Sequence, residues 1–290
     1  MDLKLEMKER CAYIEAALEK SVPEQQEFPP VIFEAMRYSL LAGGKRLRPM
    51  MVLAACEAVG GNKEDALPFA CALELVHTYS LIHDDLPCMD DDDFRRGKPT
   101  CHKVYGETMA VLAGDALQPE AFRMIASAPG MNDRQRLDAV TVLADACGGN
   151  GMVAGQVLDI QGKSSNECEV KLLHSLKTGA MLCAAAELGC ISAGADLCAR
   201  EKAVSFGRHI GLAFQVRDDV LDVVADESEF GKPVGSDREE GKTTFVDLLG
   251  LSGCEELVKQ ETELAISCLD ELGDIDFLKE MALWLANRRK

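Results

Sequence analysis

Apolar residues recur every three or four positions along almost the whole chain, a spacing that places them on one face of an α-helix. Runs in which apolar and polar residues alternate, as in a half-buried β-strand, do not compete with this pattern. The pattern therefore predicts helices at residues 3–19, 31–41, 49–59, 64–85, 108–128, 134–147, 150–158, 169–193, 197–225, 246–250, 254–272 and 276–288.

The helical pattern also bears on domain organisation. It does not change along the chain, no linker rich in proline, glycine or serine divides it, and no repeat of fixed period is found. A length of 290 residues would suit one domain or two. We therefore expect one all-helical domain over residues 1–290, packed around a central cavity.

Composition and charge narrow the classes of function. The net charge of −18 argues against nucleic acid or an anionic membrane as the main partner, because both require a basic surface. No apolar run reaches the roughly 18 residues of a membrane-spanning helix, and the charged start is unlike a signal peptide. The 12 cysteines form no C-x-x-C pair, so we expect reduced thiols and a cytoplasmic location.

The stretch 81–97, LIHDDLPCMDDDDFRRG, crowds six aspartates next to Arg95 and Arg96. Two like charges about 4 Å apart repel by roughly 1 kcal/mol in water and ~4 kcal/mol near a protein surface, so the cluster needs solvent or cations. It is either a solvated acidic loop or a site where carboxylates hold divalent cations that bind a phosphorylated ligand. In the second case both arginines would bind the same phosphates.

A second acidic cluster favours metal binding. On the predicted helix 197–225, positions i, i+3, i+4 and i+7 share one face and hold Gln215, Asp218, Asp219 and Asp222. Unpaired carboxylates would be costly among the apolar neighbours, so this stripe must meet cations or a polar cavity. One face of the predicted helix 64–85 likewise holds Glu74, His77, Leu81, Asp84 and Asp85. Two such acidic ends facing one cavity would hold metal between them.

Other polar residues suit anion binding, and each has a simpler explanation. Lys45, Arg46 and Arg48 follow a glycine pair before a predicted helix, which suits an anion site or an ordinary basic loop. Lys177 and Thr178 interrupt a long apolar helix. A buried lysine there needs an anion or a carboxylate, unless its ammonium group reaches the surface.

Taken in order, these segments resemble the trans-prenyltransferases, in particular the bacterial farnesyl diphosphate synthases and their geranylgeranyl relatives. The matching segments between Gly43 and Thr244 are GGKRLRP, H-x-x-S-L-I-H-D-D-L-P-x-M-D-x-D-x-x-R-R-G-x-P-T, GDAL, KTG, G-x-x-F-Q-x-x-D-D-x-x-D and G-K-x-x-G-x-D. Two pairs depart from the family pattern, Gln118-Pro119 and Phe245-Val246. Pro119 could kink a helix near the cavity.

The resemblance implies an all-helical homodimer that joins isopentenyl diphosphate to an allylic diphosphate. It implies a Mg²⁺ cofactor, with Mn²⁺ as a possible substitute, held by Asp84, Asp85, Asp90, Asp218, Asp219 and Asp222. The metal would neutralise the allylic diphosphate together with Arg95, Lys177, Lys232 and Lys242. Lys232 and Lys242 lie on glycine-rich turns, which also suit a plain surface loop.

By the same resemblance, isopentenyl diphosphate would be bound by Lys45, Arg48, His77 and Arg96. The allylic cation would be stabilised by the oxygens of Thr178 and Gln215 and by the Lys177 carbonyl, which makes these three the expected catalytic residues. The departing diphosphate would take the final proton, so no protein base is required.

Product length is expected to depend on Tyr79 and Ser80. Tyr79 stands five residues before Asp84, which is ~7.5 Å along a helix, and the growing chain would run along that wall. A ring there resembles the floor of short-chain enzymes and predicts the fifteen-carbon farnesyl diphosphate, unless Tyr79 packs in the core. The alternatives are a geranylgeranyl diphosphate synthase, a class I terpene synthase, and a non-catalytic subunit or acidic metal-binding protein.

Overall fold

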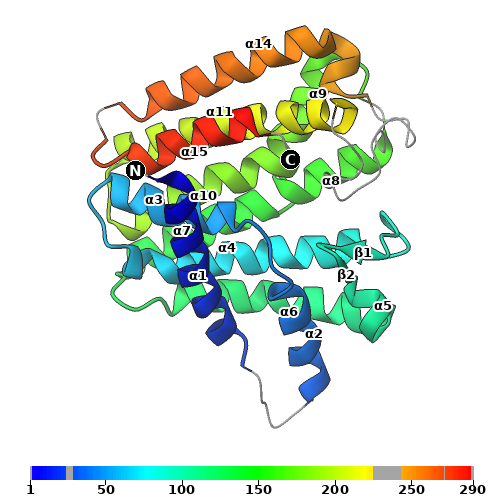
Figure 1. The fold of residues 1–290 in the computed structure, drawn as a ribbon. Helices are drawn as coiled ribbons and strands as arrows, with labels where there is room; N and C mark the ends of the chain where they lie inside the picture. The colour runs from blue at the N-terminus through cyan, green and yellow to red at the C-terminus, as the bar shows by residue number, and fades with distance from the viewer. Residues whose placement is uncertain (1, 24–28, 163, 225–242, 271, 289–290) are drawn as a thin grey trace.

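The computed structural model describes residues 2–23, 29–162, 164–224, 243–270 and 272–288. This part of the chain is almost entirely helical, which confirms the predicted fold class (Figure 1). The α-helices are α1 (Leu3–Ser21), α2 (Pro30–Leu40), α3 (Leu47–Ala58), α4 (Lys63–Asp84), α5 (Cys101–Tyr105), α6 (Glu107–Ala126), α7 (Asp133–Cys147), α8 (Met152–Gln161), α9 (Glu167–His174), α10 (Ala180–Ser192), α11 (Leu197–Val224), α14 (Phe245–Cys268) and α15 (Asp276–Asn287).

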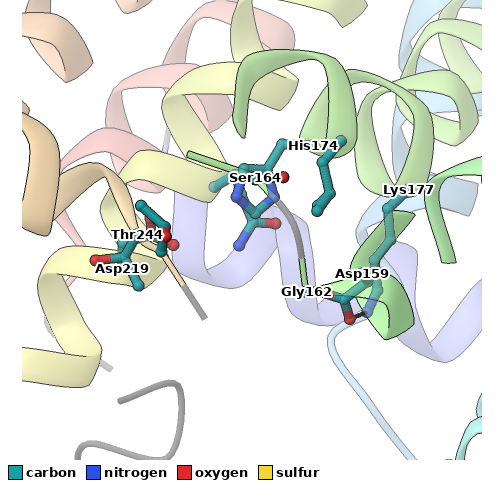
Figure 2. Close-up of a pocket in the computed structure, with 10 residues that line it drawn as sticks. Asp159, Gly162, Ser164, His174, Lys177, Asp219 and Thr244 are labelled. Atoms are coloured by element: carbon teal, nitrogen blue, oxygen red, sulfur yellow. Dashed lines mark hydrogen bonds and ion pairs between the residues drawn. The ribbon is translucent and has the colours of Figure 1, made fainter. Parts of the chain in front are cut away.

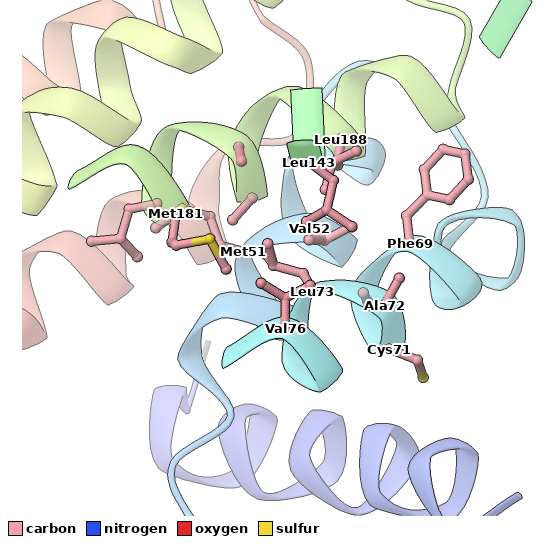
Figure 3. Packing of buried hydrophobic residues seen from close by; sticks show 14 of the residues in the cluster. Met51, Val52, Phe69, Cys71, Ala72, Leu73, Val76, Leu143, Met181 and Leu188 are labelled. Carbon is pink, nitrogen blue, oxygen red and sulfur yellow. The ribbon is translucent and has the colours of Figure 1, made fainter. Parts of the chain in front are cut away.

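Helix α4 is the most enclosed element near the first acidic cluster. It packs against α3, α6 and α10, and 12 of its 22 residues are buried. Leu73 and Val76 lie beside Met51 of α3 in the core (Figure 3). Because interiors are close-packed, this core fixes the C-terminal end of α4, where Asp84 stands.

Helix α11 carries the second acidic stripe. Val216 and Val220 are buried with Phe245 and Val258 of α14. Helix α10 packs against both α4 and α11. It therefore sets the distance between the two acidic helices.

A hairpin, β1 (Phe94–Arg95) with β2 (Lys98–Pro99), follows the first acidic cluster and was not predicted. Its turn residues Arg96 and Gly97 have φ of +54° and +75°, the conformation of a type I′ turn. The short helix α5 after it was not predicted either. Strands of two residues contain too little alternation for a sequence pattern to show them.

The predicted helix ends lie within a few residues of the observed ones, but one predicted helix is divided in the structure. The segment predicted as one helix at 169–193 contains a π-helical turn, η1 (Ser175–Gly179), between α9 and α10. By contrast, the predicted break between helices 246–250 and 254–272 is present: within α14, Gly250 has the non-helical angles φ +66° and ψ 169°. None of the helices in the described ranges is long and apolar enough to span a membrane.

Candidate active site

A cavity of about 340 Å³, the main cavity, lies between α4, α8 and η1. Its polar groups include Asp84, Lys177 and Thr178. Its apolar wall includes Leu81, Met89, Met152, Val153, Val157 and Ile160. An apolar cavity with polar groups gathered at certain positions is the usual form of a small-molecule site.

A second cavity of about 120 Å³, the side cavity, also contains Lys177 in its wall. Gln215 and Asp219 line it from α11, and Thr244 lines it from the start of α14. Figure 2 shows Lys177 next to Asp159 on one side of this cavity, with Asp219 and Thr244 on the other. Lys177 therefore lies where a cavity beside the first aspartate cluster meets a cavity beside the second.

The first cluster stands at the C-terminal end of α4. Asp85 is buried, and its Oδ1 accepts a 2.5 Å hydrogen bond from Arg95 Nε, while Arg95 Nη2 donates to Asp92 Oδ2 at 3.1 Å. Burial raises the pKa of Asp84 to about 6, with Lys177 opposing the shift and Asp90 adding to it. Among the described residues, the side chains of Asp84 and Asp90 have no hydrogen-bonding partner, so both can bind a cation.

The second cluster lies on α11 as predicted. Asp218 forms an ion pair with Arg288, which also donates to the Phe214 carbonyl at 3.2 Å. Asp219 Oδ2 accepts a hydrogen bond from the Phe245 backbone N–H at 2.8 Å. Asp222 is 8% exposed. The stripe therefore lies at the contact between α11 and the C-terminal elements.

The three expected catalytic residues come together around η1. Thr178 Oγ1 donates to Gln215 Oε1 at 3.1 Å, and Lys177 Nζ lies 2.5 Å from Asp159 Oδ2. A π-turn inserts a residue into the helix and is frequent at functional sites. Gly155 of α8 permits this packing, because a Cβ there would come within 2.2 Å of the backbone nitrogen of Lys177.

A cationic group borders the main cavity beside α3. Arg48 Nη1 lies 3.3 Å from His77 Nε2, and Arg96 donates to the Gly43 carbonyl. Gly44 has φ +129°, and a Cβ there would come within 2.6 Å of the Arg96 guanidinium carbon, which explains the glycine at this position. The hairpin and the α3 loop thus bring together cations that are far apart in the sequence. Lys45 is exposed on the same loop, with Nζ 5.6 Å from the centre of the Trp284 ring.

Burial and the positive charges of Arg48, Arg96, Arg95 and Arg46 lower the pKa of His77 well below its ordinary value of 6.5. The ring is therefore neutral at physiological pH when no anion is bound. A bound anion would counter these charges and favour the charged ring.

Arg46 and Glu74 differ from the sequence expectation. Glu74 was placed on the same face as His77 and Asp84, but it is 2% exposed and its Oε1 lies 2.6 Å from Arg46 Nη1. Arg46 also donates to the Leu40 carbonyl at 2.7 Å. This pair is therefore part of the core, and it does not line the main cavity.

Asp159 and Gln156 were missed by sequence analysis. Both lie on α8, where Gln156 lines the main cavity and Asp159 pairs with Lys177. The available signal was the pair of polar residues at i and i+3 in the otherwise apolar segment MVAGQVLDI. Lys177, which was expected to need an anion or a carboxylate, has this carboxylate as its partner.

Tyr79 and Ser80 line the main cavity, and the Tyr79 side chain is largely buried there. The Tyr79 ring packs edge-on against His83, with 5.8 Å between centroids, and burial raises the pKa of its hydroxyl to about 12.

Pro119 does not lie near this cavity. It stands inside α6 next to a groove formed with Ile32 and Phe33 of α2, so its expected effect on the cavity is wrong. Lys232 and Lys242 lie outside the described residues.

The donor set suits the magnesium ion that the resemblance implied. All six predicted metal ligands offer carboxylate oxygens, the atoms that Mg²⁺ prefers, and no sulfur or nitrogen ligand stands among them. The raised pKa of Asp84 shows that its negative charge lacks sufficient compensation from the protein alone. A cation at this end of α4 would supply that compensation.

Comparisons with known proteins agree with this geometry. The chain matches the family model described as polyprenyl synthetase over residues 29–273. It is 49% identical over 263 residues to a chloroplastic geranylgeranyl pyrophosphate synthase of Capsicum annuum, covering 89% of this chain and 71% of that protein. It is 45% identical over 266 residues to a farnesyl diphosphate synthase of Geobacillus stearothermophilus, covering 89% and 88%.

Solved structures show the same fold. A FPP/GFPP synthase from Zymomonas mobilis superposes with a TM-score of 0.87 at 36% identity, covering 98% of this chain and 99% of that one. A geranylgeranyl pyrophosphate synthetase from Pyrococcus horikoshii superposes with a TM-score of 0.89 at 33% identity, covering 99% and 98%. The helices, the two aspartate clusters and these matches lead to one conclusion: the chain belongs to the polyprenyl synthetase family.

Proposed function

We propose that this protein is a short-chain prenyl diphosphate synthase that joins isopentenyl diphosphate to dimethylallyl or geranyl diphosphate and releases farnesyl diphosphate. One observation carries the proposal: Arg48 and His77 border the same apolar cavity as Asp84 and Lys177. Two groups that suit diphosphates thus adjoin one space that suits a hydrocarbon chain. Farnesyl diphosphate is proposed because the Tyr79 ring narrows that space.

The allylic diphosphate would lie between the aspartate clusters. Bound Mg²⁺ would neutralise the diphosphate and make it a better leaving group. Its ligands would be Asp84, Asp85, Asp90, Asp218, Asp219 and Asp222. Lys177 and Arg95 would bind the diphosphate directly, which requires each to share or exchange its present carboxylate partner. Lys232 and Lys242 are proposed for the same diphosphate on the resemblance alone.

The isopentenyl diphosphate would be bound by Lys45, Arg48, His77 and Arg96. The contact of Arg48 with His77 and the closeness of Arg96 to Gly44 support this assignment for three of the four. The low pKa of His77 also supports it, because a ring surrounded by cations gains most from an anion. The double bond of this substrate would then face the allylic carbon across the cavity.

Stabilisation of the allylic cation is assigned to oxygen atoms at η1. Thr178 Oγ1 and Gln215 Oε1 lie 3.1 Å apart, and Lys177 and Thr178 reach the main cavity from the same turn. Oxygen dipoles fixed before the reaction stabilise a developing charge without having to reorient.

We further propose that the whole chain is one domain and functions as a homodimer. The 12 free cysteines are typical of a reducing compartment and support a cytoplasmic location.

A geranylgeranyl diphosphate synthase is the second candidate. Relatives named geranylgeranyl pyrophosphate synthases reach 49% identity. The proposal of a fifteen-carbon product therefore rests on the residues that line the main cavity and not on overall sequence similarity. A class I terpene synthase is disfavoured because Arg48, His77 and Arg96 would then have no second diphosphate to bind.

The decisive experiment is incubation with Mg²⁺, isopentenyl diphosphate and either allylic diphosphate, followed by chromatography of the dephosphorylated products. Farnesol is expected, geranylgeraniol would select the second candidate, and product formed without isopentenyl diphosphate would indicate a cyclase. Asp84→Asn should abolish turnover. The matched control is Asp133→Asn, because the Asp133 side chain is fully exposed at the start of α7. No elongation by folded wild-type protein would contradict the proposal.

A further inference from the structure

Three potential metal ligands converge among residues that are not assigned to the substrate-bound magnesium. Carboxylate oxygens of Asp91 and Asp93 and a ring nitrogen of His102 lie within 4.8 Å of one another. Ligands bound to one tetrahedral or octahedral ion at about 2.1 Å lie roughly 3–4 Å apart, so small side-chain rotations would suffice. The two aspartates are exposed on the loop before β1, and His102 is buried on α5 with 6% of its surface exposed.

The hydrogen bonds around His102 determine its tautomer. Thr100 Oγ1 lies 2.8 Å from the Asp92 carbonyl oxygen and 3.1 Å from His102 Nδ1. A hydroxyl has one proton, and a carbonyl can only accept, so the Thr100 proton is used in the bond to Asp92. The His102 contact therefore requires Nδ1–H to donate to Thr100, and the neutral ring has its lone pair on Nε2.

That lone pair has no hydrogen-bond donor. Nε2 of His102 is buried, and among the residues that the structure describes it has no hydrogen-bond partner. Buried polar atoms without partners are rare and call for an explanation such as an unseen ion. An imidazole whose Nδ1–H is held by an oxygen, with Nε2 open, is also the usual arrangement of a metal-binding histidine.

The existing contacts of the two aspartates leave room for a metal. Lys103 Nζ lies 2.5 Å from Asp93 Oδ1, and both side chains are more than 40% exposed. Exposed ion pairs of this kind contribute little and are readily replaced. The second oxygen of Asp93 remains available, as does the carboxylate of Asp91, for which the described residues provide no ion pair.

We propose that Asp91, Asp93 and His102 bind a divalent transition-metal ion at a site separate from the substrate-binding aspartates. Two carboxylates with one imidazole suit Mn²⁺ or Zn²⁺ better than Mg²⁺, which prefers oxygen ligands alone. The ion would join the loop after Asp90 to α5. Because this loop leads directly into β1, which carries Arg95, the metal would hold one wall of the proposed active site in place.

The test uses Mn²⁺ as the probe, because the many thiols of the chain bind Zn²⁺ but are poor ligands for Mn²⁺. Electron paramagnetic resonance of the full chain, without diphosphate, measures the affinity, and spin-echo modulation detects a nitrogen bonded to the metal. The nitrogen signal should persist in Asp84→Asn/Asp218→Asn, which removes substrate-cluster carboxylates. It should disappear in His102→Gln, with Mn²⁺ binding at this site at least tenfold weaker.

Two further variants complete the test. His83→Gln is the control, since this histidine lies next to Asp84 and its ring contacts the Val111 carbonyl at 3.1 Å. The control should keep the nitrogen signal. Asp91→Asn alters only an exposed side chain, so it gives a result even if His102→Gln does not fold, and it should also weaken Mn²⁺ binding about tenfold. Unchanged binding in Asp91→Asn, or the absence of a nitrogen signal from wild-type protein, would overturn the proposal.

Discussion

Nζ of Lys177 lies 2.5 Å from Oδ2 of Asp159, a residue 18 positions earlier in the chain. The same helix, α8, also brings Gly155 against the backbone of Lys177. One helix thus fixes both the main chain and the ammonium group of a proposed catalytic residue. The position of η1 depends on α8 as much as on its own sequence.

Gly155→Ala should therefore reduce turnover at least tenfold with little change in the helix content of the protein. The added Cβ would come within 2.2 Å of the backbone nitrogen of Lys177 and must displace η1. Circular dichroism and steady-state kinetics would measure the two effects. Gly149→Ala is the matched control, because its Cβ would meet nothing within 4 Å, and equal activities of the two variants would refute this role.

Tyr79→Ala should lengthen the product from fifteen carbons to twenty or more. Tyr79 forms part of the wall of the main cavity, so removing its ring would enlarge the space available to a growing chain. Chromatography of the dephosphorylated products tests this, with Tyr79→Phe as a control that keeps the ring and the product. Unchanged product length in Tyr79→Ala would show that another residue limits the chain.

Protonation of Asp84 should stabilise the metal-free protein and weaken its binding of Mg²⁺. Its pKa of about 6 lies above the ordinary value of 3.8, so the folded state binds this proton more tightly than the unfolded state does. The metal-free protein should then gain stability from this group as the pH falls through about 6 toward 4, while Mg²⁺ affinity falls because the ligand is protonated.

Asp84→Asn should stabilise the metal-free protein by about 1–3 kcal/mol at neutral pH, because the costly charge is gone. Urea unfolding of both proteins at neutral pH and near pH 4 measures this. The gain should disappear at the lower pH, where Asp84 of the wild type is already protonated. A gain that persisted there would exclude ionisation of Asp84 as its cause.

Glu74→Gln should lower the free energy of unfolding by about 3 kcal/mol, because the buried Arg46 charge then has only the half-exposed carboxylate of Glu15, 3.6 Å away, as an ion-pair partner. The ion pair of the exposed Arg134 with Asp138 is the comparison, and Arg134→Ala should cost about 0–1 kcal/mol. Chemical denaturation measures both values. Similar losses for the two variants would mean that the Arg46 pair is solvated.

The sequence predicted most of the helices and the two aspartate faces, because both follow from the helical repeat of 3.6 residues. A helix that is buried on one face has apolar residues at that spacing, so α4 and α11 can be recognised from the sequence alone. Likewise Asp218 and Asp219 needed only their positions relative to Gln215.

The partners of these residues could not be predicted, because they depend on contacts between distant segments. Asp218 pairs with Arg288, which is 70 positions away, and no local pattern links the two. Arg46 and Arg48 are two residues apart, yet one enters the core and the other borders the cavity. The left-handed backbone of Arg46, with φ of +49°, precedes the first residue of α3 and separates their directions.

The π-turn has a consequence for how this helix can change. Each residue of an α-helix rotates the chain by about 100°, so removing one residue from Ser175–Gly179 would yield a more regular helix with α9 turned by that angle relative to α10. His174, now stacked 5.6 Å from Phe245, would then point elsewhere. A deletion that made this helix regular would thus remove the stacking contact between α9 and α14. At this position in the chain, an insertion or deletion is a greater change than any substitution.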